Sequence, residues 1–119
     1  MALSRLAEAF AAEIRNHDWS DAPYRADRAG HDRSRDSNSY GIQQLESDKT
    51  DTVRLNVMWV TAQVLGYMDP NFDVYEFAEA AGVKILTSRG ERSGHILYGL
   101  RKVDGRYCRP GTWDATASA

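Results

Sequence analysis

Residues 69–83 read DPNFDVYEFAEAAGV, and this stretch holds the strongest local signals in the chain. Asp73 stands where a helix cap would, with a glutamate three residues later, which is a variant of the capping box. Phe72, just before the cap, and Phe77 are spaced as a hydrophobic staple, in which two apolar side chains pack across the start of a helix. The stretch therefore predicts a helix that begins at residue 74.

Two further signals set the end of this helix and separate it from the segment before it. Gly82 suits the left-handed conformation that closes a helix, so we expect a short helix over residues 74–81. Pro70 disfavours a helical conformation in the residue before it, and it prevents a preceding helix from running straight on.

The preceding segment predicts a longer helix over residues 50–68, with Asp48 or Thr50 as its cap. Apolar residues recur along one face, and others widen that face over most of the circumference. The first set is Val53, Val57, Val60, Val64 and Met68, and the second is Leu55, Met58, Trp59, Leu65 and Tyr67. Such a helix is either the central element of the core or, with one side open, part of the interface of a homodimer.

The N-terminal residues predict a further helix over residues 3–16. Apolar side chains at three- and four-residue steps make one stripe on it, namely Leu3, Leu6, Ala7, Phe10, Ala11 and Ile14. Acidic residues interrupt the stretch, and it has neither a basic start nor a small-residue cleavage site. We therefore interpret it as a helix and not as a signal peptide.

Between these helices lies a polar segment, residues 17–49, that is long for an unstructured connection inside a domain. Its arginines alternate with aspartates, so its charges nearly cancel. One interpretation is a solvated linker, with the pairs His17-Asp18 and His31-Asp32 in water. The other is a surface for a protein partner, because aromatic and arginine side chains dominate interface hot spots. The partner-binding candidates are Trp19, Tyr24, Arg25, Arg28, Arg33 and Arg35, and residues 40–45 could form a short strand.

After Gly82 the apolar spacing no longer follows a helix. Residues 83–109 predict a basic β segment with strands at VKILT, HILYGLRKV and RYCRP, a turn at SRGERSG and a hairpin turn at Asp104-Gly105. The tail, residues 110–119, is weakly patterned and is expected to fray. The whole chain thus predicts a one-domain α+β fold, three helices followed by a small antiparallel β-hairpin or sheet.

Composition limits the class of protein further. With 119 residues, of which 42% are hydrophobic, the chain can form one packed core. Its single cysteine, Cys108, cannot form an internal disulfide and fits a reducing compartment, so we expect a cytoplasmic protein. The longest apolar run, residues 53–68, is interrupted by polar residues and is too short to span a bilayer. We therefore expect no membrane contact.

The net charge of −2 conceals an uneven distribution. Residues 1–83 hold 8 Lys or Arg against 14 Asp or Glu, residues 84–109 hold 7 against 2, and Asp114 adds one negative charge. The basic third could recognise phosphate or an acidic partner, or it could hold the two parts of the domain together.

A helix followed by a basic hairpin is the order of elements in winged-helix DNA binders. Nucleic-acid binding is therefore the alternative to a protein partner, with Lys84, Arg89, Arg92, Arg101, Lys102 and Arg106 as the contacts. Against it, the helix before the hairpin is acidic and would be repelled by the phosphate backbone.

No motif indicates catalysis, a metal or a cofactor. The three histidines are far apart, and the chain has no Cys-x-x-Cys or His-x-x-x-His spacing. Two arginines near Cys108 could lower its pKa, but the sequence supplies no base or oxyanion site for a nucleophile. Neither glycine-rich stretch has the residue order of a phosphate loop. We expect a protein that is not an enzyme, while a site assembled from scattered residues stays open as a third alternative.

Residues 53–82 also carry a resemblance. Their ending, Pro-x-Phe-Asp-x-x-x-Phe-x-x-Ala-x-Gly, resembles one that follows an apolar helix in small uncharacterised proteins of phages, prophages and actinobacterial mobile elements. This chain departs from them by continuing past Gly82 with the basic segment, and no functional residue is carried over. The resemblance implies an accessory protein that binds a host macromolecule. A host protein, which it would inhibit or redirect, is favoured over nucleic acid.

Overall fold

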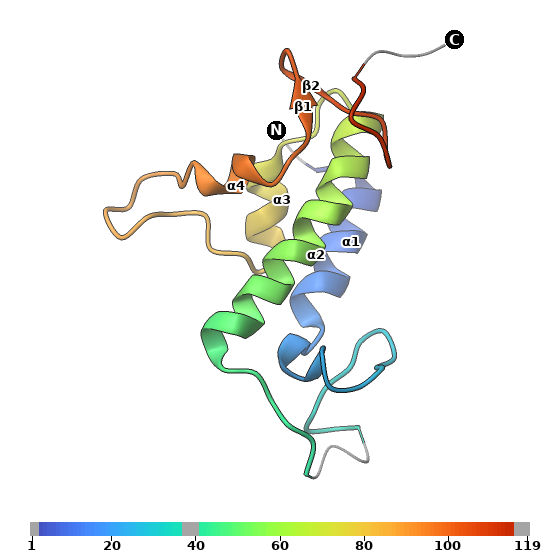
Figure 1. Ribbon diagram of the computed structural model, residues 1–119, viewed down its shortest axis with the longest axis vertical. Helices are drawn as coiled ribbons and strands as arrows, with labels where there is room; N and C mark the ends of the chain where they lie inside the picture. Colours follow the sequence, from blue (N-terminus) through green and yellow to red (C-terminus); the bar gives the residue numbers. More distant parts are fainter. Residues whose placement is uncertain (1–2, 37–40, 116–119) are drawn as a thin grey trace.

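The computed structural model describes residues 3–36 and 41–115. Its elements in chain order are α1 (Arg5–Asn16), the 3-10 turn η1 (Trp19–Asp21), α2 (Ser47–Met68), α3 (Val74–Ala80), α4 (His95–Tyr98), β1 (Lys102–Val103) and β2 (Arg106–Tyr107). The predicted α+β class is confirmed, and helix predominates. Helices α1, α2 and α3 pack on one another, with the polar segment at one end of α2 and the β hairpin at the other (Figure 1).

The local signals around α3 are confirmed. The Asp73 carboxylate accepts a hydrogen bond from the backbone N–H of Tyr75 at 2.9 Å, and the rings of Phe72 and Phe77 lie 5.4 Å apart between centroids. Gly82 closes the helix with a φ of 85°, in the left-handed region that favours glycine. The helix begins where predicted and ends one residue earlier.

Helix α1 packs through its smallest side chains. Ala7, Ala11 and Ile14 are buried, whereas Leu6 is 61% exposed and Phe10 is 43% exposed. The expected single stripe is therefore only partly right, since the larger side chains flank the contact with the neighbouring helices.

The boundaries of α2 differ slightly from the prediction. The helix starts at Ser47, and its N-cap is Glu46, whose side chain makes no capping hydrogen bond. The expectation that Asp48 or Thr50 caps the helix is wrong. Among the described residues, no helix combines the length and the apolar character needed to cross a membrane.

One side of α2 is open, which is the second of the two arrangements left open by the sequence. The face that meets the core carries Met58, Ala62 and Leu65, which are buried. On the opposite face, Val60 is 72% exposed and Met68 is 70% exposed. Because α2 is apolar on nearly all sides, its sequence does not mark which side packs inward.

The predicted β segment is only partly a sheet. The hairpin around Asp104-Gly105 is confirmed, with β1 and β2 antiparallel and Lys102 opposite Tyr107. The two earlier strands are wrong, since the first is reduced to a single bridge between Leu86 and Arg92 and the second begins with the helical turn α4. Periodicity alone does not separate a buried helical turn from a strand in an apolar run this short.

Trp59 of α2 fixes the position of α4. Its indole N–H donates to the carbonyl of Ile96 at 2.8 Å. A Cβ at Gly99 would lie 2.0 Å from the indole ring, so only glycine allows this close approach. The tryptophan therefore holds the end of α4 against the long helix.

Gln63 of α2 holds the hairpin in a similar way. Its amide nitrogen donates to the carbonyls of Arg101 at 3.0 Å and Cys108 at 3.1 Å, and its oxygen accepts from the N–H of Arg101 at 2.8 Å. All three bonds join one buried side chain to the backbone on both sides of the hairpin. The C-terminal segment is thus hydrogen-bonded to the helix that the core is built on.

The described part of the tail, which was expected to fray unless Trp113 docks, is hydrogen-bonded to the segment around the hairpin. Arg101 Nε donates to the carbonyl of Thr112 at 2.8 Å, and the N–H of Arg109 donates to the carbonyl of Asp114 at 2.9 Å. These bonds turn residues 110–115 back toward the hairpin, while residues 116–119 lie outside the described part of the chain.

Candidate functional site

An open groove of about 520 Å³ lies between the helices and the polar segment. Phe10, Glu13 and Ile14 of α1 and Val57 and Thr61 of α2 line one side of it. The polar segment supplies the other side, with His17, Trp19, Ala22, Arg25, Asp27, Ala29 and Gly30. An apolar base with polar and charged groups at its edge is the composition of a binding site.

The wall of this groove is a folded loop and not a solvated linker. His31 is fully buried, and its Nε2 lies 2.7 Å from Asp21 Oδ2 and its Nδ1 2.5 Å from Asp36 Oδ2. The expectation that His31 lies in water is therefore wrong. A buried ring of this kind requires partners for both nitrogens, and the segment provides them from either side of the histidine.

The arginines of the segment neutralise these aspartates within the loop. Arg33 makes a short ion pair with the buried Asp21, Arg28 Nη2 lies 2.7 Å from Asp36 Oδ1, and Arg25 Nε lies 2.5 Å from Asp27 Oδ1. The near cancellation of charge predicted from the sequence is right, but it takes place largely inside the fold.

The charges in the loop shift the ionisation of the two histidines in opposite directions. Burial acts to lower the pKa of His31, but its hydrogen bonds to Asp21 and Asp36 outweigh burial and raise the pKa above the ordinary value. The pKa of His17 is lowered, first by burial and then by the nearby charge of His31. The imidazole at the edge of the groove therefore releases its proton at lower pH than the imidazole behind the wall.

Three side chains of the loop are of the types that bind metal ions. One ligand atom from each of Asp21, Asp27 and His31 lies within 4.8 Å of the others, in the part of the chain that the structure describes. Both nitrogens of His31 are already hydrogen-bonded, and Arg33 pairs with the second oxygen of Asp21. The ion pairs and hydrogen bonds explain the cluster without a metal.

The predicted partner-binding residues do not share one surface. Trp19 and Arg25 line the groove, while Tyr24, Arg28 and Arg35 project outward, and Arg33 turns inward to its ion pair. Trp19 also has a structural role, because its indole N–H donates to the carbonyl of Ile14 at 2.9 Å. Residues 41–45 hold no strand, and Tyr40 lies outside the described residues.

Several residues of the groove were not predicted from the sequence. Phe10 and Val57 were assigned to the core, and His17 to solvent, although its ring lies 4.1 Å from that of Trp19 between centroids. The aromatic neighbour two residues away was a usable signal for His17. No local signal shows that Phe10 and Val57 meet beside the loop, because they come from helices far apart in sequence.

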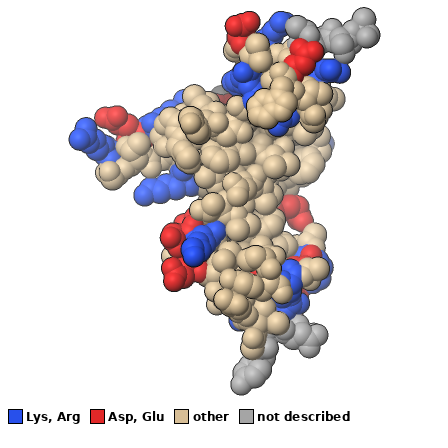
Figure 2. Space-filling model, in the orientation of Figure 1, with Lys and Arg blue, Asp and Glu red and all other residues tan. Residues whose placement is uncertain are grey.

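The six residues predicted for nucleic acid separate into two groups. Lys84, Arg89 and Arg92 belong to the extended connection between α3 and α4, while Arg101, Lys102 and Arg106 belong to the hairpin (Figures 1 and 2). Three of the six contact aromatic rings: Arg92 lies 4.4 Å over Tyr75, Arg101 5.5 Å over Trp113 and Lys102 4.5 Å over Tyr107. The expected order of a helix followed at once by a hairpin is also broken, because α4 comes between them.

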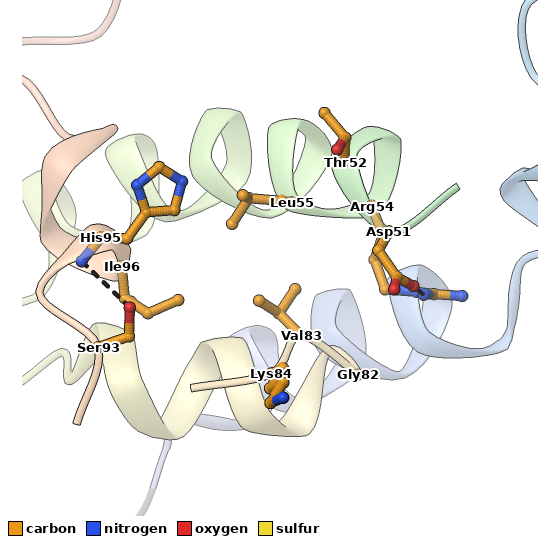
Figure 3. A pocket seen from close by; sticks show the side chains of 10 residues that line it. All are labelled: Asp51, Thr52, Arg54, Leu55, Gly82, Val83, Lys84, Ser93, His95 and Ile96. Atoms are coloured by element: carbon orange, nitrogen blue, oxygen red, sulfur yellow. Dashed lines mark hydrogen bonds and ion pairs between the residues drawn. The ribbon is translucent and has the colours of Figure 1, made fainter. Parts of the chain in front are cut away.

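A smaller pocket of about 230 Å³ lies between the start of α2 and residues 82–84 and 93–96. Leu55, Val83 and Ile96 give it an apolar interior (Figure 3). At one end of the pocket, Arg54 is paired with Asp51 at 3.2 Å. The other lysine or arginine of the lining, Lys84, makes no ion pair with the lining residues. A single exposed lysine gives little selectivity for an anion, so we do not choose this pocket as the site.

Comparison of the chain with protein-family models, with curated proteins and with solved structures found no match.

Proposed function

We propose that this chain is a small, non-catalytic binding protein of the cytoplasm that holds a segment of another protein in the groove beside α1. The observation that carries the proposal is the groove of about 520 Å³, whose lining includes two of the predicted partner-binding residues, Trp19 and Arg25. Apolar side chains at Phe10 and Val57 provide contact area, and Glu13 and the pair of Arg25 with Asp27 provide polar contacts at the edge.

The hydrogen bonds within the wall support a binding role. The buried His31 bonds to Asp21 and Asp36, and the N–H of Leu45 donates to the carbonyl of Ser20 at 2.8 Å. A preformed surface loses less conformational entropy on binding than a loop that must first become ordered. Cys108, the one cysteine, is buried, so its thiol is not placed to act as a nucleophile.

The partner segment should carry apolar side chains for the base of the groove and basic ones for Glu13 at its edge. If the chain has the phage or mobile-element origin that its resemblance implies, the partner is a host protein that it inhibits or redirects. This part of the proposal rests on the resemblance, and the groove itself is independent of it.

The test fills the groove without disturbing its wall. Ala29 lines the groove and is exposed, so Ala29→Arg places a long side chain at the mouth of the groove at little cost to the fold. Ala26→Arg is the matched control, because Ala26 is exposed on the same loop and is not among the lining residues. Tagged wild-type protein and both variants are used to capture proteins from a host lysate after nuclease treatment, with elution over a salt gradient.

We expect a protein that is retained by the wild type and by Ala26→Arg, and lost or weakened at least tenfold with Ala29→Arg. Equal capture by both arginine variants would reject the groove as the contact. Replacing Trp19 and Arg25 together is a poorer test, since both also hold the loop.

Nucleic-acid binding is the second proposal, and the exposure of Arg89 and Arg92 on a connection that extends away from the helices favours it (Figure 1). It predicts capture of nucleic acid before nuclease treatment, steep loss with salt and further loss in Arg89→Ala with Arg92→Ala. Binding that is insensitive to salt would count against it.

A further inference from the structure

The outward face of α2 is apolar along most of its length. Val60, Val64, Tyr67 and Met68 are exposed there, and Val53 is half-buried. In Figure 2 a band without lysine, arginine, aspartate or glutamate runs along the middle of the molecule, over α2. These exposures mean that no described part of the chain covers this face.

The spacing on this face is that of a helix pair. Five residues follow one another at alternating steps of four and three, namely Val53, Val57, Val60, Val64 and Tyr67. This is the 3.5-residue repeat of a coiled-coil seam, in which each apolar side chain fits between those of a facing helix. The seam (these five residues) extends over residues 53–67, 14 residue steps of helix, which is about 21 Å at 1.5 Å per residue.

The seam can also match itself in an antiparallel pair of helices. Val60 and Val64 lie two residues on either side of Ala62, and Val57 and Tyr67 lie five residues on either side of it. If a second α2 lies antiparallel against the first with the two-fold axis at the level of Ala62, Val60 meets Val64 of the second copy and Val57 meets its Tyr67. A two-fold interface requires a patch that matches itself in this way.

The apolar area is large enough for a dimer. Leu6 and Phe10 of α1 widen the seam, because Phe10 and Val57 line the same groove and Leu6 lies one helical turn from Phe10. With about 150 to 250 Å² for a whole large apolar residue, the exposed fractions of Leu6, Phe10, Val60, Val64, Tyr67 and Met68 amount to about 600 Å² per copy. Two copies would bury about 1,200 Å², the lower end of the range for specific stable interfaces.

We propose that the occupant of this face is a second copy of the chain, and that α2 pairs antiparallel with its counterpart around a two-fold axis at the level of Ala62. The repeat, the self-matching of the seam about that level and the area all fit a copy of the same helix. The inference does not rest on the proposed function, since Val60, Val64 and Tyr67 lie outside the lining of the groove. Phe10 and Val57 belong to both surfaces, so the second copy would lie beside the groove at that edge. The loop end of the groove, around Trp19 and Ala29, lies outside the seam.

The first experiment measures the mass of the full chain by sedimentation velocity over a range of concentrations. We expect a species of twice the 13.4 kDa monomer mass. Val60→Asp should weaken the dimer at least a hundredfold, because it buries two carboxylates in an apolar seam, each against Val64 of the other copy. Val60 is already 72% exposed, so the monomer should keep its fold and its circular dichroism spectrum.

Leu86→Asp is the matched control, because Leu86 is an exposed apolar residue on the connection between α3 and α4. It should leave the dimer unchanged. A monomer at all concentrations, or a dimer that survives Val60→Asp, would overturn the proposal, as would binding of this face to other proteins only.

A cross-link distinguishes the antiparallel two-fold arrangement from other dimers. Val60→Cys combined with Val64→Cys should form disulfides between copies under mild oxidation, because these two positions face each other across the axis and come near enough for the bond. Cys108 is buried and should not compete. Leu86→Cys should stay largely monomeric under the same conditions, and equal cross-linking of the two variants would reject the proposed axis.

Discussion

Two long connections leave the helical body, and they behave differently. Residues 17–46 join α1 to α2, and residues 81–94 join α3 to α4. Both are polar and both carry arginines. The first folds around the fully buried His31, whereas the second extends outward, with exposed side chains over most of its length (Figure 1).

The two connections differ in whether a buried side chain hydrogen-bonds to separate parts of the connection. The imidazole of His31 has two nitrogens, and each meets an aspartate from a different part of the chain, Asp21 and Asp36. In the other connection, Arg92 lies over the ring of Tyr75 and pairs with Leu86 in a single bridge. Charge content alone therefore does not decide which connection folds. A buried side chain that hydrogen-bonds to two parts of the connection decides it.

The largest expected effect on the folding of the first connection comes from His31→Ala. The substitution leaves Asp21 and Asp36 without their shared partner, and removal of one member of a buried ion pair typically costs about 3 to 5 kcal/mol. We expect rapid proteolysis between residues 17 and 46 and a lower midpoint of urea unfolding. The matched control is His95→Ala, since His95 is an exposed histidine just after the second connection. Its effect should stay below about 1 kcal/mol, and equal effects would contradict the comparison.

The pH dependence of the first connection sharpens the comparison. The pKa of His31 is raised, so its contribution to stability is present below the unfolded value of 6.5 and is lost as pH rises through the folded value. The pKa of Asp36 is held well below 3.8 by Arg28 and by His31, so its contribution is present above 3.8 and is lost in acid. Protection of the loop from proteolysis should therefore be greatest between pH 3.8 and pH 6.5, the unfolded pKa values of Asp36 and His31.

Asp36→Asn tests the origin of this window. It removes a carboxylate that raises the pKa of His31, so the loss of protection on the alkaline side should move to lower pH. An unchanged alkaline limit would show that Asp36 does not hold the charge of His31.

The smallest expected effect lies in the second connection. Arg92→Ala removes the guanidinium from the ring of Tyr75, a contact worth about 0.5 to 1 kcal/mol at an exposed site. Arg89→Ala, the control, removes an exposed charge of the same connection and should change the free energy of unfolding by less than about 0.5 kcal/mol. Urea unfolding measures both, and a larger loss for Arg89→Ala would assign the anchoring to the wrong arginine.

The sequence predicts well where a cap, a closing residue or a turn acts on its neighbours. The capping by Asp73, the staple of Phe72 with Phe77 and the hairpin at Asp104-Gly105 depend on residues only a few positions apart. Such signals do not require knowledge of the rest of the fold.

The sequence predicts poorly where the outcome depends on residues far away. The apolar circumference of α2 is compatible with several orientations, and only the packing of α1 and α3 determines that Met58 faces inward and Val60 outward. The burial of His31 depends on Asp21, ten residues away, and the groove depends on Phe10 meeting Val57. No local sequence pattern indicates either of these two contacts.

The amide of Gln63 has a consequence for the smallest sheet in the molecule. It presents one acceptor and donor hydrogens, as a peptide group does, and bonds to both the N–H and the carbonyl of Arg101. It thus takes the place of a peptide in a neighbouring strand. Two strands alone are marginally stable in water, and a third makes such a sheet secure. In this protein α2 supplies hydrogen bonds to the hairpin through Gln63, where a third strand would otherwise supply them.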